Sequence, residues 1–348
     1  MKLRLLALST AFLLAVACGG DATPDAPAPL VTLPADEGPH DSGIEWWYFN
    51  GLLTDNRGQE YSYHYVTFQS EATGGAVPHL LQASLGDHTT GKHLTGEQAL
   101  LDSLDADATG IDIAVNGWKM QGDGQSYSLE FDLEGYSLDL DAVSVRPPVL
   151  HHGLGLVSLG PAGDTFYYSR TRLDVTGSIS IDGRQRPVTG LTWMDHQWGD
   201  DISQRVGWDW ASVQLDDGSD LMAVMVWDPS ERTPFAGYGT LVSPDGSVLN
   251  LAQSDVSISS SDIWWTSPAT GIEYPSGWTL TVPSLDLSLA LEPVLVDSEF
   301  ASSRYTPAAY WEGEVRATGT RQGQAIAGRG FVELVGYDPR QLEPTLAP

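Results

Sequence analysis

The chain has 348 residues, with 17 Lys and Arg against 46 Asp and Glu, which gives a formal net charge of −29. Nucleic acid and anionic membrane surfaces are disfavoured as partners, because both carry the same sign of charge. The carboxylates are scattered singly along the chain, which is typical of a solvated acidic surface and not of a binding tail.

The N-terminus has the layout of a secretory signal peptide. Lys2 and Arg4 precede an apolar run over residues 5–17, and small residues lead into Cys18. This order of charge, apolar core and small residues is that of an export signal. The run has about thirteen residues, which is short of the roughly twenty that a membrane-spanning helix needs. We therefore predict that residues 1–17 are removed during export.

Cys18 is the only cysteine of the chain and follows Ala15-Val16-Ala17, a stretch that resembles the bacterial lipobox. A lone thiol cannot form an internal disulfide in an oxidising compartment, whereas lipidation gives it a use. We predict that Cys18 anchors the protein to the bacterial cell envelope; cleavage without lipidation, and release of a soluble protein, is the alternative. Residues 18–39 are rich in Gly, Ala, Asp and Pro, which predicts a flexible tether.

The remaining chain of roughly 310 residues is long for one hydrophobic core. It predicts two domains, over residues 40–195 and 196–348. Alternating apolar and polar residues predict strands at 61–68, 111–115, 127–133, 173–181, 221–227 and 278–291. Turn dipeptides such as Asp182-Gly183 and Asp245-Gly246 fall at hairpin intervals. The fold class is therefore all-β and antiparallel, with sandwich and barrel both open.

Twelve tryptophans are many for one chain, and most of them cluster in pairs. Adjacent strand residues point to opposite faces, so Trp46 and Trp47 cannot line the same core, whereas Trp208 and Trp210 share a face. Large rings that simply fill a core are one interpretation. Rings on one face of a barrel can also form an apolar cavity, and the clustering favours a pocket for a hydrophobic ligand.

The first polar motif places Glu45 before the aromatic run Trp46-Trp47-Tyr48-Phe49. A carboxylate among rings is costly to ionise, so Glu45 should have a raised pKa or a committed partner. If Glu45 points into a cavity, it is a candidate acid or base. If it closes a barrel end against Arg170 or Arg172, its role is structural.

The second polar motif is Trp193-Met194-Asp195-His196-Gln197-Trp198-Gly199. On an extended strand Asp195 and His196 face apart. A histidine beside a tryptophan in an apolar site can act as a general acid or base near neutral pH, although a silent, hydrogen-bonded histidine is the alternative. The eight histidines show no metal-ligand spacing, so we predict neither a metal nor a cofactor.

Together, the motifs resemble a known family, the two-domain lipocalin-like proteins grouped with carotenoid 1,2-hydratase (hydroxyneurosporene synthase) and AttH-like proteins. The matching stretches are Glu45 to Gly51, Leu150 to Gly153, Tyr167 to Arg170, Trp193 to Gly199, Gly207 to Trp210, Tyr310 to Gly313 and Gly328 to Leu334. The resemblance implies two consecutive antiparallel lipocalin-like β-barrels with the motifs near their interface. It also implies chemistry on large apolar molecules.

The resemblance implies acid–base roles for Asp195 and His196, a cation-stabilising role for Trp198, and supporting roles for Glu45 and Tyr168. We therefore predict Asp195, His196 and Glu45 as catalytic candidates. The predicted ligand pocket consists of Trp46, Trp47, Tyr48, His64, Tyr168, Arg170, Trp198, Trp208 and Trp210.

Two hypotheses for function follow. In the first, an exported lipoprotein binds a hydrophobic small molecule or lipid between two barrels. In the second, the chain is a hydro-lyase similar to carotenoid 1,2-hydratase, an isomerase, or a hydrolase, acting on an isoprenoid-type substrate by acid–base catalysis. Because AttH-like proteins are often associated with transport, an ABC-type transport system is a further expected partner.

Overall fold

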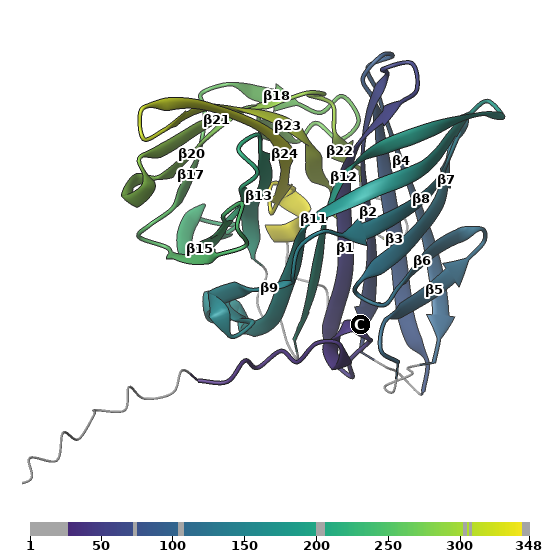
Figure 1. The fold of residues 1–348 in the computed structure, drawn as a ribbon, viewed down its shortest axis with the longest axis horizontal. Helices are drawn as coiled ribbons and strands as arrows, with labels where there is room; N and C mark the ends of the chain where they lie inside the picture. The colour runs from purple at the N-terminus through teal and green to yellow at the C-terminus, as the bar shows by residue number, and fades with distance from the viewer. Residues whose placement is uncertain are drawn as a thin grey trace, which may run out of the picture.

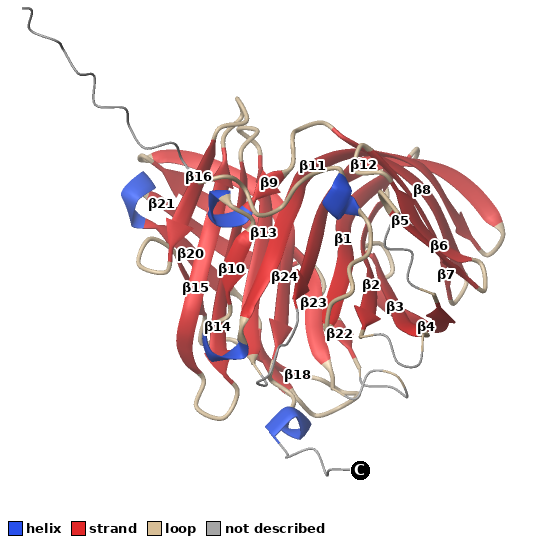
Figure 2. Cartoon of the chain, turned by 90° about the horizontal axis from the view of Figure 1, so that it is seen from below, coloured by secondary structure: helices blue, strands red, loops and turns tan. Residues whose placement is uncertain are grey.

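The computed structural model describes residues 27–71, 75–103, 108–199, 206–301, 305 and 308–342. The predicted signal peptide, Cys18 and the first part of the predicted tether lie outside these residues. The described chain consists almost entirely of antiparallel strands in two large sheets that lie side by side (Figure 1). Helical structure is confined to short single turns (Figure 2). The all-β prediction is confirmed.

The first sheet has 12 strands among the described residues and runs in the order β4-β3-β2-β1-β12-β11-β8-β7-β6-β5, with β9 and β10 paired to β11. Its strands are β1 (Ile44–Asp55), β2 (Glu60–Ser70), β3 (Val77–Asp87), β4 (Lys92–Asp102), β5 (Ile111–Val115), β6 (Trp118–Gly122), β7 (Ser126–Leu133), β8 (Tyr136–Ser144), β9 (Val149–Leu150), β10 (Leu156–Ser158), β11 (Asp164–Ile181) and β12 (Arg184–Gly199). Strand β4 at one edge approaches β5 and β7 near the other edge, so the sheet forms a nearly closed barrel, called here the first barrel.

The second sheet has 10 strands in the described chain and runs in the order β16-β15-β14-β13-β24-β23-β21-β20-β17, with β22 paired to β23. It forms a half-barrel. Its strands are β13 (Gly207–Leu215), β14 (Asp220–Asp228), β15 (Thr233–Val242), β16 (Val248–Ala252), β17 (Ser257–Ser260), β20 (Trp278–Val282), β21 (Leu287–Pro293), β22 (Glu299–Phe300), β23 (Tyr310–Arg321) and β24 (Gln324–Val335).

A separate hairpin and five short 3-10 helices complete the described elements. The hairpin consists of β18 (Trp264–Thr266) and β19 (Glu273–Pro275). The helices are η1 (Ala35–Glu37), η2 (His151–Gly153), η3 (Gly160–Ala162), η4 (Pro283–Leu285) and η5 (Pro339–Leu342). In the described part of the chain, no helix has the length and apolar character to span a membrane.

The passage between the two sheets lies after Gly199. Strand β12 is paired along its length with β1 and β11 and therefore belongs wholly to the first barrel. The chain enters the second sheet at Gly207. The boundary predicted between residues 195 and 196 lies inside β12, because the sequence motif that suggested it forms the end of a strand and not a linker.

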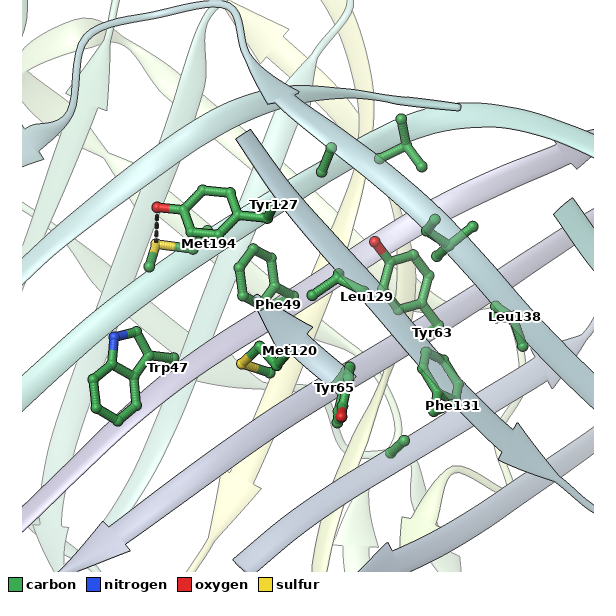
Figure 3. Close-up of a cluster of buried hydrophobic side chains, with 14 of the residues drawn as sticks. Trp47, Phe49, Tyr63, Tyr65, Met120, Tyr127, Leu129, Phe131, Leu138 and Met194 are labelled. Carbon is green, nitrogen blue, oxygen red and sulfur yellow. Dashed lines mark hydrogen bonds between the residues drawn. The ribbon is translucent and has the colours of Figure 1, made fainter. Parts of the chain in front are cut away.

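Aromatic side chains fill the interior of the first barrel (Figure 3). The ring of Phe131 lies 5.0 Å from that of Tyr65 and 6.1 Å from that of Tyr63, measured between centroids. Trp47, Phe49 and both tyrosines are at most 1 % exposed. Rings on the inward face were one predicted source of a ligand cavity. Here these rings pack against one another and form a hydrophobic core.

The segment before β1 packs against one end of the first barrel. Val31 is 3 % exposed and belongs to the barrel core, and Glu37 in η1 is 2 % exposed. The predicted flexible tether over 18–39 is therefore wrong for its last part. The composition of the segment hid this docking, because its partners, Arg170 and Leu154 among them, lie far away in the sequence.

The two sheets are joined by apolar contacts and by ion pairs. A shared core contains Tyr48 and Trp193 from the first barrel and Trp210 and Phe331 from the second sheet. Asp220 of β14 is fully buried and binds two arginines of the first barrel. The relative position of the two sheets is thus fixed by side chains at their contact.

Candidate active site

Strand alternation divides the motif residues between two environments. In the register of β1 with β12, Tyr48 lies opposite Asp195 and Trp47 lies opposite His196. Tyr48 and Asp195 face the second sheet, whereas Trp47 belongs to the core of the first barrel, where its ring stacks on His196 at 4.6 Å. The predicted catalytic group of Asp195, His196 and Glu45 is therefore split, because neighbouring strand residues point to opposite faces.

A pocket with a volume of about 480 Å³ lies between the first barrel and the second sheet. We call it the interface pocket. Its lining residues are Ile44, Trp46, Tyr48, Val66, Phe68, Leu80, Gln82, Leu159, Tyr167, Asp195, Gln197, Trp208, Trp210, Val224, Val226, Tyr238, Tyr305, Ala308, Tyr310, Glu312, Glu333 and Val335. Most are aromatic or aliphatic, which is typical of a site for a small apolar ligand.

The structure places four of the nine predicted pocket residues on the wall of the interface pocket. Trp46, Tyr48, Trp208 and Trp210 line the interface pocket, as does the catalytic candidate Asp195. The remaining predicted pocket residues do not line it. They are His64, which lies behind the pocket wall, and Trp47, Tyr168, Arg170 and Trp198, which lie on the barrel side.

Asp195 is a buried carboxyl group with three hydrogen-bond donors. Tyr167 Oη donates to Oδ2 at 2.8 Å, whereas Trp193 Nε1, at 2.7 Å, and Ser169 Oγ both donate to Oδ1. Burial raises the pKa of Asp195 to about 6, although the three donors act in the opposite direction. Asp195 is therefore ionised at neutral pH and is able to accept a proton nearby.

Behind Asp195, a hydrogen-bonded chain reaches the second sheet. Ser169 Oγ lies 2.7 Å from His151 Nε2, and His151 Nδ1 lies 2.9 Å from Thr240 Oγ1. Burial lowers the pKa of His151 to about 3, so the ring is neutral. Since the hydroxyl of Ser169 donates to Asp195, it accepts from His151 Nε2, which fixes the tautomer of the ring. The chain holds Asp195 in one orientation.

Glu312 and Glu333 place two more carboxyl groups in the pocket. They lie directly opposite each other on the paired strands β23 and β24. Trp208 Nε1 donates to Glu333 at 3.0 Å, and Tyr48 Oη donates to Glu312. Burial raises the pKa of Glu333 to about 7, and the charge on Asp195 adds to this effect. Burial and then the neighbouring Glu333 hold the pKa of Glu312 well above its usual range, so this pair carries a proton at neutral pH.

His64 lies behind the pocket wall, where burial keeps its ring neutral. Ser84 Oγ lies 2.7 Å from His64 Nδ1, and His64 Nε2 lies 3.3 Å from Tyr310 Oη. The Tyr310 hydroxyl donates to Gln82 at 3.0 Å, so it accepts from the histidine. Burial holds the pKa of His64 well below its usual range. The predicted pocket residue thus orients Tyr310, which itself lines the pocket.

A second polar group, which we call the inner cluster, lies on the barrel side of β1 and β12. Glu45 Oε1 is 2.6 Å from His196 Nε2 and 2.7 Å from His40 Nδ1. Trp198 stacks on the His40 ring with 4.0 Å between centroids. Although burial opposes it, hydrogen bonds from the two histidines lower the pKa of Glu45. The expected raised pKa is therefore wrong, and the committed partner was the correct alternative.

The inner cluster continues through Tyr168 to Glu37. Tyr168 Oη lies 3.1 Å from His196 Nδ1 and donates to Glu37 Oε2 at 2.7 Å. Glu37 forms a buried ion pair with Arg170, whereas Arg172 pairs with Asp220. The suggested pairing of Glu45 with either arginine is wrong; Arg170 instead binds a carboxylate from the docked N-terminal segment. The cluster closes this end of the first barrel.

Several site residues were not predicted as such. Glu312 and Glu333 stand in the matching stretches of the sequence, yet neither was assigned a role. A signal was present, because Tyr310 and Glu312 are two residues apart and therefore share one strand face, while Trp311 between them lies on the other face. His40 and Glu37 gave no usable signal, since their partners Glu45, His196 and Arg170 are identified only by the fold.

Comparison with known proteins places these features in a family. The AttH-like family model matches residues 24–337. The crystal structure of a protein described as AttH from Nitrosomonas europaea is 28% identical, with a TM-score of 0.80, and the match covers 91% of this chain and 100% of the other.

Two further relatives are more distant. Kievitone hydratase from Nectria haematococca has a TM-score of 0.72 at 18% identity, covering 88% of this chain and 93% of the other, and shares the fold. Dehydratase asqC from Emericella nidulans is 24% identical over 209 residues, which cover 57% of this chain and 58% of that protein. The chain thus spans little more than half the length of this relative. On the extent of the family match, the chain belongs to the AttH-like family.

Proposed function

We propose that the protein is an enzyme that adds water to, or removes it from, a hydrophobic small molecule in the interface pocket. One observation carries this proposal: buried acidic groups of opposite protonation state face one aromatic pocket. Asp195 has a pKa of about 6 and Glu333 a pKa of about 7, and the pKa of Glu312 is higher than its usual range. A site that keeps one carboxyl group ionised and another protonated is suited to acid–base catalysis.

The names of two relatives support the same reaction class. One is described as a dehydratase and another as a hydratase. Removal and addition of water are the two directions of one reaction and need the same groups. A catalyst for either direction needs a base for a carbon-bound proton and an acid for the departing hydroxyl group.

In the removal of water, each carboxyl group of the pocket has one step. The Asp195 carboxylate takes a proton from a substrate carbon, and the electrons of that C–H bond form the new double bond. The C–O bond of the adjacent carbon breaks, and the departing hydroxyl takes a proton from the Glu312–Glu333 pair and leaves as water. Addition of water runs through the same steps in reverse. Tyr48 and Trp208 orient the acidic pair through their hydrogen bonds.

The pocket also suits an apolar substrate in size and lining. Its volume of about 480 Å³ lies within the usual range of roughly 300–1,000 Å³ for small-molecule sites. Trp46, Trp208 and Trp210 contribute ring surface to the wall. This lining equally supports a second candidate function, in which the protein binds and carries a hydrophobic molecule or lipid without changing it.

Analysis of the molecule that copurifies with the protein tests both functions. The native protein is extracted, the extract is analysed by mass spectrometry, and the compound is then incubated with fresh enzyme. Val224 lines the pocket from β14 and is 6 % exposed, so Val224→Trp is expected to fill the pocket and abolish copurification. A mass change of one water on incubation supports the enzyme, and an unchanged compound supports the carrier. Equal recovery from wild type and Val224→Trp would place the ligand elsewhere.

We further propose that the protein is exported and anchored through a lipid on Cys18, close to apolar ligands and to an ABC-type transport system. The support is the order of charged, apolar and small residues before Cys18. Cys18→Ser is expected to move the protein from the membrane to the soluble fraction of the cell envelope and to stop incorporation of labelled fatty acid. Unchanged fractionation and labelling of this variant would contradict the anchor.

A further inference from the structure

Three side-chain atoms of the inner cluster that could bind a metal ion lie close together. His40 Nδ1, Glu45 Oε1 and His196 Nε2 all lie within 4.8 Å of one another. They come from the docked N-terminal segment, from β1 and from β12. We propose that they bind a divalent first-row transition metal of the Zn²⁺ type, and that this metal fastens the N-terminal segment to the end of the first barrel.

The positions of the hydrogen atoms on Tyr168 and His196 provide the first argument. The Tyr168 hydroxyl has one hydrogen and two neighbours, Glu37 Oε2 at 2.7 Å and His196 Nδ1 at 3.1 Å. Glu37 is paired with Arg170 and can only accept. Tyr168 therefore donates to Glu37, and its oxygen accepts the hydrogen on His196 Nδ1.

This tautomer leaves the lone pair of His196 Nε2 facing the carboxylate oxygen Glu45 Oε1 at 2.6 Å. Two lone pairs at this separation repel each other unless a cation lies with them. The positive charge is supplied either by a proton, on the ring or on the carboxyl group, or by a metal ion. His40 Nδ1 lies 2.7 Å from the same oxygen, so a metal here gains a third ligand.

The surrounding groups have the arrangement found around ligating residues. The other oxygen of Glu45 accepts from Gln69 Nε2 at 3.1 Å and from the His40 backbone N–H at 2.8 Å. His40 Nε2 lies 3.6 Å from Asp36 Oδ1, and His196 is connected through Tyr168 to Glu37. Ligating histidines usually direct their second ring nitrogen to a carboxylate or another acceptor, and ligating carboxylates are themselves hydrogen-bonded.

The donor set selects the kind of metal. Two imidazole nitrogens and one carboxylate oxygen match the three-ligand sets that hold Zn²⁺ with a further position open to water. Mg²⁺ and Ca²⁺ prefer oxygen ligands only. Ligands of a tetrahedral metal at bonds of about 2.0 Å lie roughly 3.3 Å apart, so binding requires the rings to move outward from Glu45. His40 has a side chain that is 23% exposed and belongs to the docked segment, which gives both the freedom to move and a route for the metal.

Metal titration of the full chain tests the proposal without reference to enzymatic activity. The protein is freed of metal with a chelator and titrated with Zn²⁺ against a chromophoric competitor, and with Co²⁺ by visible absorption. Wild type is expected to bind a single Zn²⁺, and the bound metal is expected to protect the N-terminal segment against protease. Tyr168→Phe, which removes the hydroxyl that orients His196, is expected to weaken binding roughly 10–100-fold, and His40→Ala should weaken it further.

His152→Ala is the matched control. His152 is an exposed histidine of η2 and its ring packs on Tyr238, outside the inner cluster. This variant is expected to bind Zn²⁺ like wild type. The proposal is overturned if wild type does not bind Zn²⁺, or if His40→Ala and His152→Ala bind it equally; a proton then holds the cluster. Because Tyr168→Phe changes only one hydroxyl, it provides a folded variant if His40→Ala fails to fold.

Discussion

Asp195→Asn and Glu333→Gln are each expected to lower kcat/KM for water transfer by roughly 10²–10⁴-fold, the usual contribution of a general acid or base. Asn at position 195 keeps the shape of the side chain, and with its amide oxygen in the place of Oδ1 it keeps the contact to Trp193, while its NH2 group faces Tyr167; it cannot take a proton. Gln at position 333 keeps the contact to Trp208 but has no proton to give. The measurement is steady-state kinetics on the compound recovered from the pocket.

The pH dependence of kcat/KM provides a second readout of the same assignment. Activity should rise as the pH passes about 6, where Asp195 ionises, and fall as it passes about 7, where Glu333 loses its proton. Because the two groups interact, the two apparent pKa values of the pH profile describe the pair and not either residue alone. Asp195→Asn should flatten the acid limb of the residual activity and Glu333→Gln the alkaline limb.

Asp209→Asn is the control for burial of an acidic group. Burial raises the pKa of Asp209 to about 6, as it does for Asp195. Asp209 however binds Tyr337 and Trp227 on the other side of β13 from the pocket residues Trp208 and Trp210. Its replacement should leave kcat/KM unchanged. A loss as large as that of Asp195→Asn would show that the activity responds to buried acids in general and not to groups in the pocket.

A stability measurement separates lost catalysis from lost folding. The pKa of Glu333 is raised from 4.5 to about 7, so its stabilising protonation is complete below pH 4.5 and is lost as the pH rises through about 7. Glutamine is neutral at every pH. Glu333→Gln should therefore unfold like wild type near pH 4 and gain up to about 3 kcal/mol over wild type near pH 8.

Asp220→Ala is expected to lower the free energy of unfolding by roughly 3–5 kcal/mol, because it removes the buried carboxylate that pairs with two largely buried arginines. Asp220 accepts from Arg146 Nη1 at 2.6 Å, from Arg172 Nη2 at 2.6 Å and from Thr171 Oγ1 at 2.8 Å. These three donors belong to the first barrel and Asp220 to the second sheet. The variant should therefore also loosen the contact that forms the pocket.

Chemical denaturation measures this effect, with Asp228→Ala as the control. Asp228 ends the same strand, is exposed, and accepts hydrogen bonds from the backbone and the hydroxyl of the nearby Ser230. Its removal should change stability little. If the two alanine variants were equally stable, the buried ion pairs of Asp220 would have no part in joining the sheets.

The fold class could be predicted from sequence because strand alternation and turn dipeptides are local signals. The same alternation showed that Asp195 and His196 face apart, and the structure places them in different environments. The catalytic grouping of these two residues came from the family resemblance, whereas the structure separates them onto opposite faces of β12. Only tertiary structure identifies which residue of a motif faces which neighbour.

The acidic partners of Asp195 could not be located from sequence, because they reach the pocket through sheet pairing across the contact between two domains. Glu312 and Glu333 become neighbours through the pairing of β23 with β24. The inner cluster illustrates the same limit, since His40 and His196 meet at Glu45 only when the N-terminal segment docks. The spacing of histidines along the chain does not predict such a tertiary contact.

The alternation of β1 and β12 also decides how this protein can change. Trp46 and Tyr48 face the pocket, whereas the intervening Trp47 faces the packed core. A mutant library restricted to pocket-facing positions can therefore vary the shape of the substrate site while every second residue retains the folding core. Because Tyr48 and Trp210 also belong to the core shared by the two sheets, substitutions at these pocket positions change the contact between the sheets as well as the shape of the site.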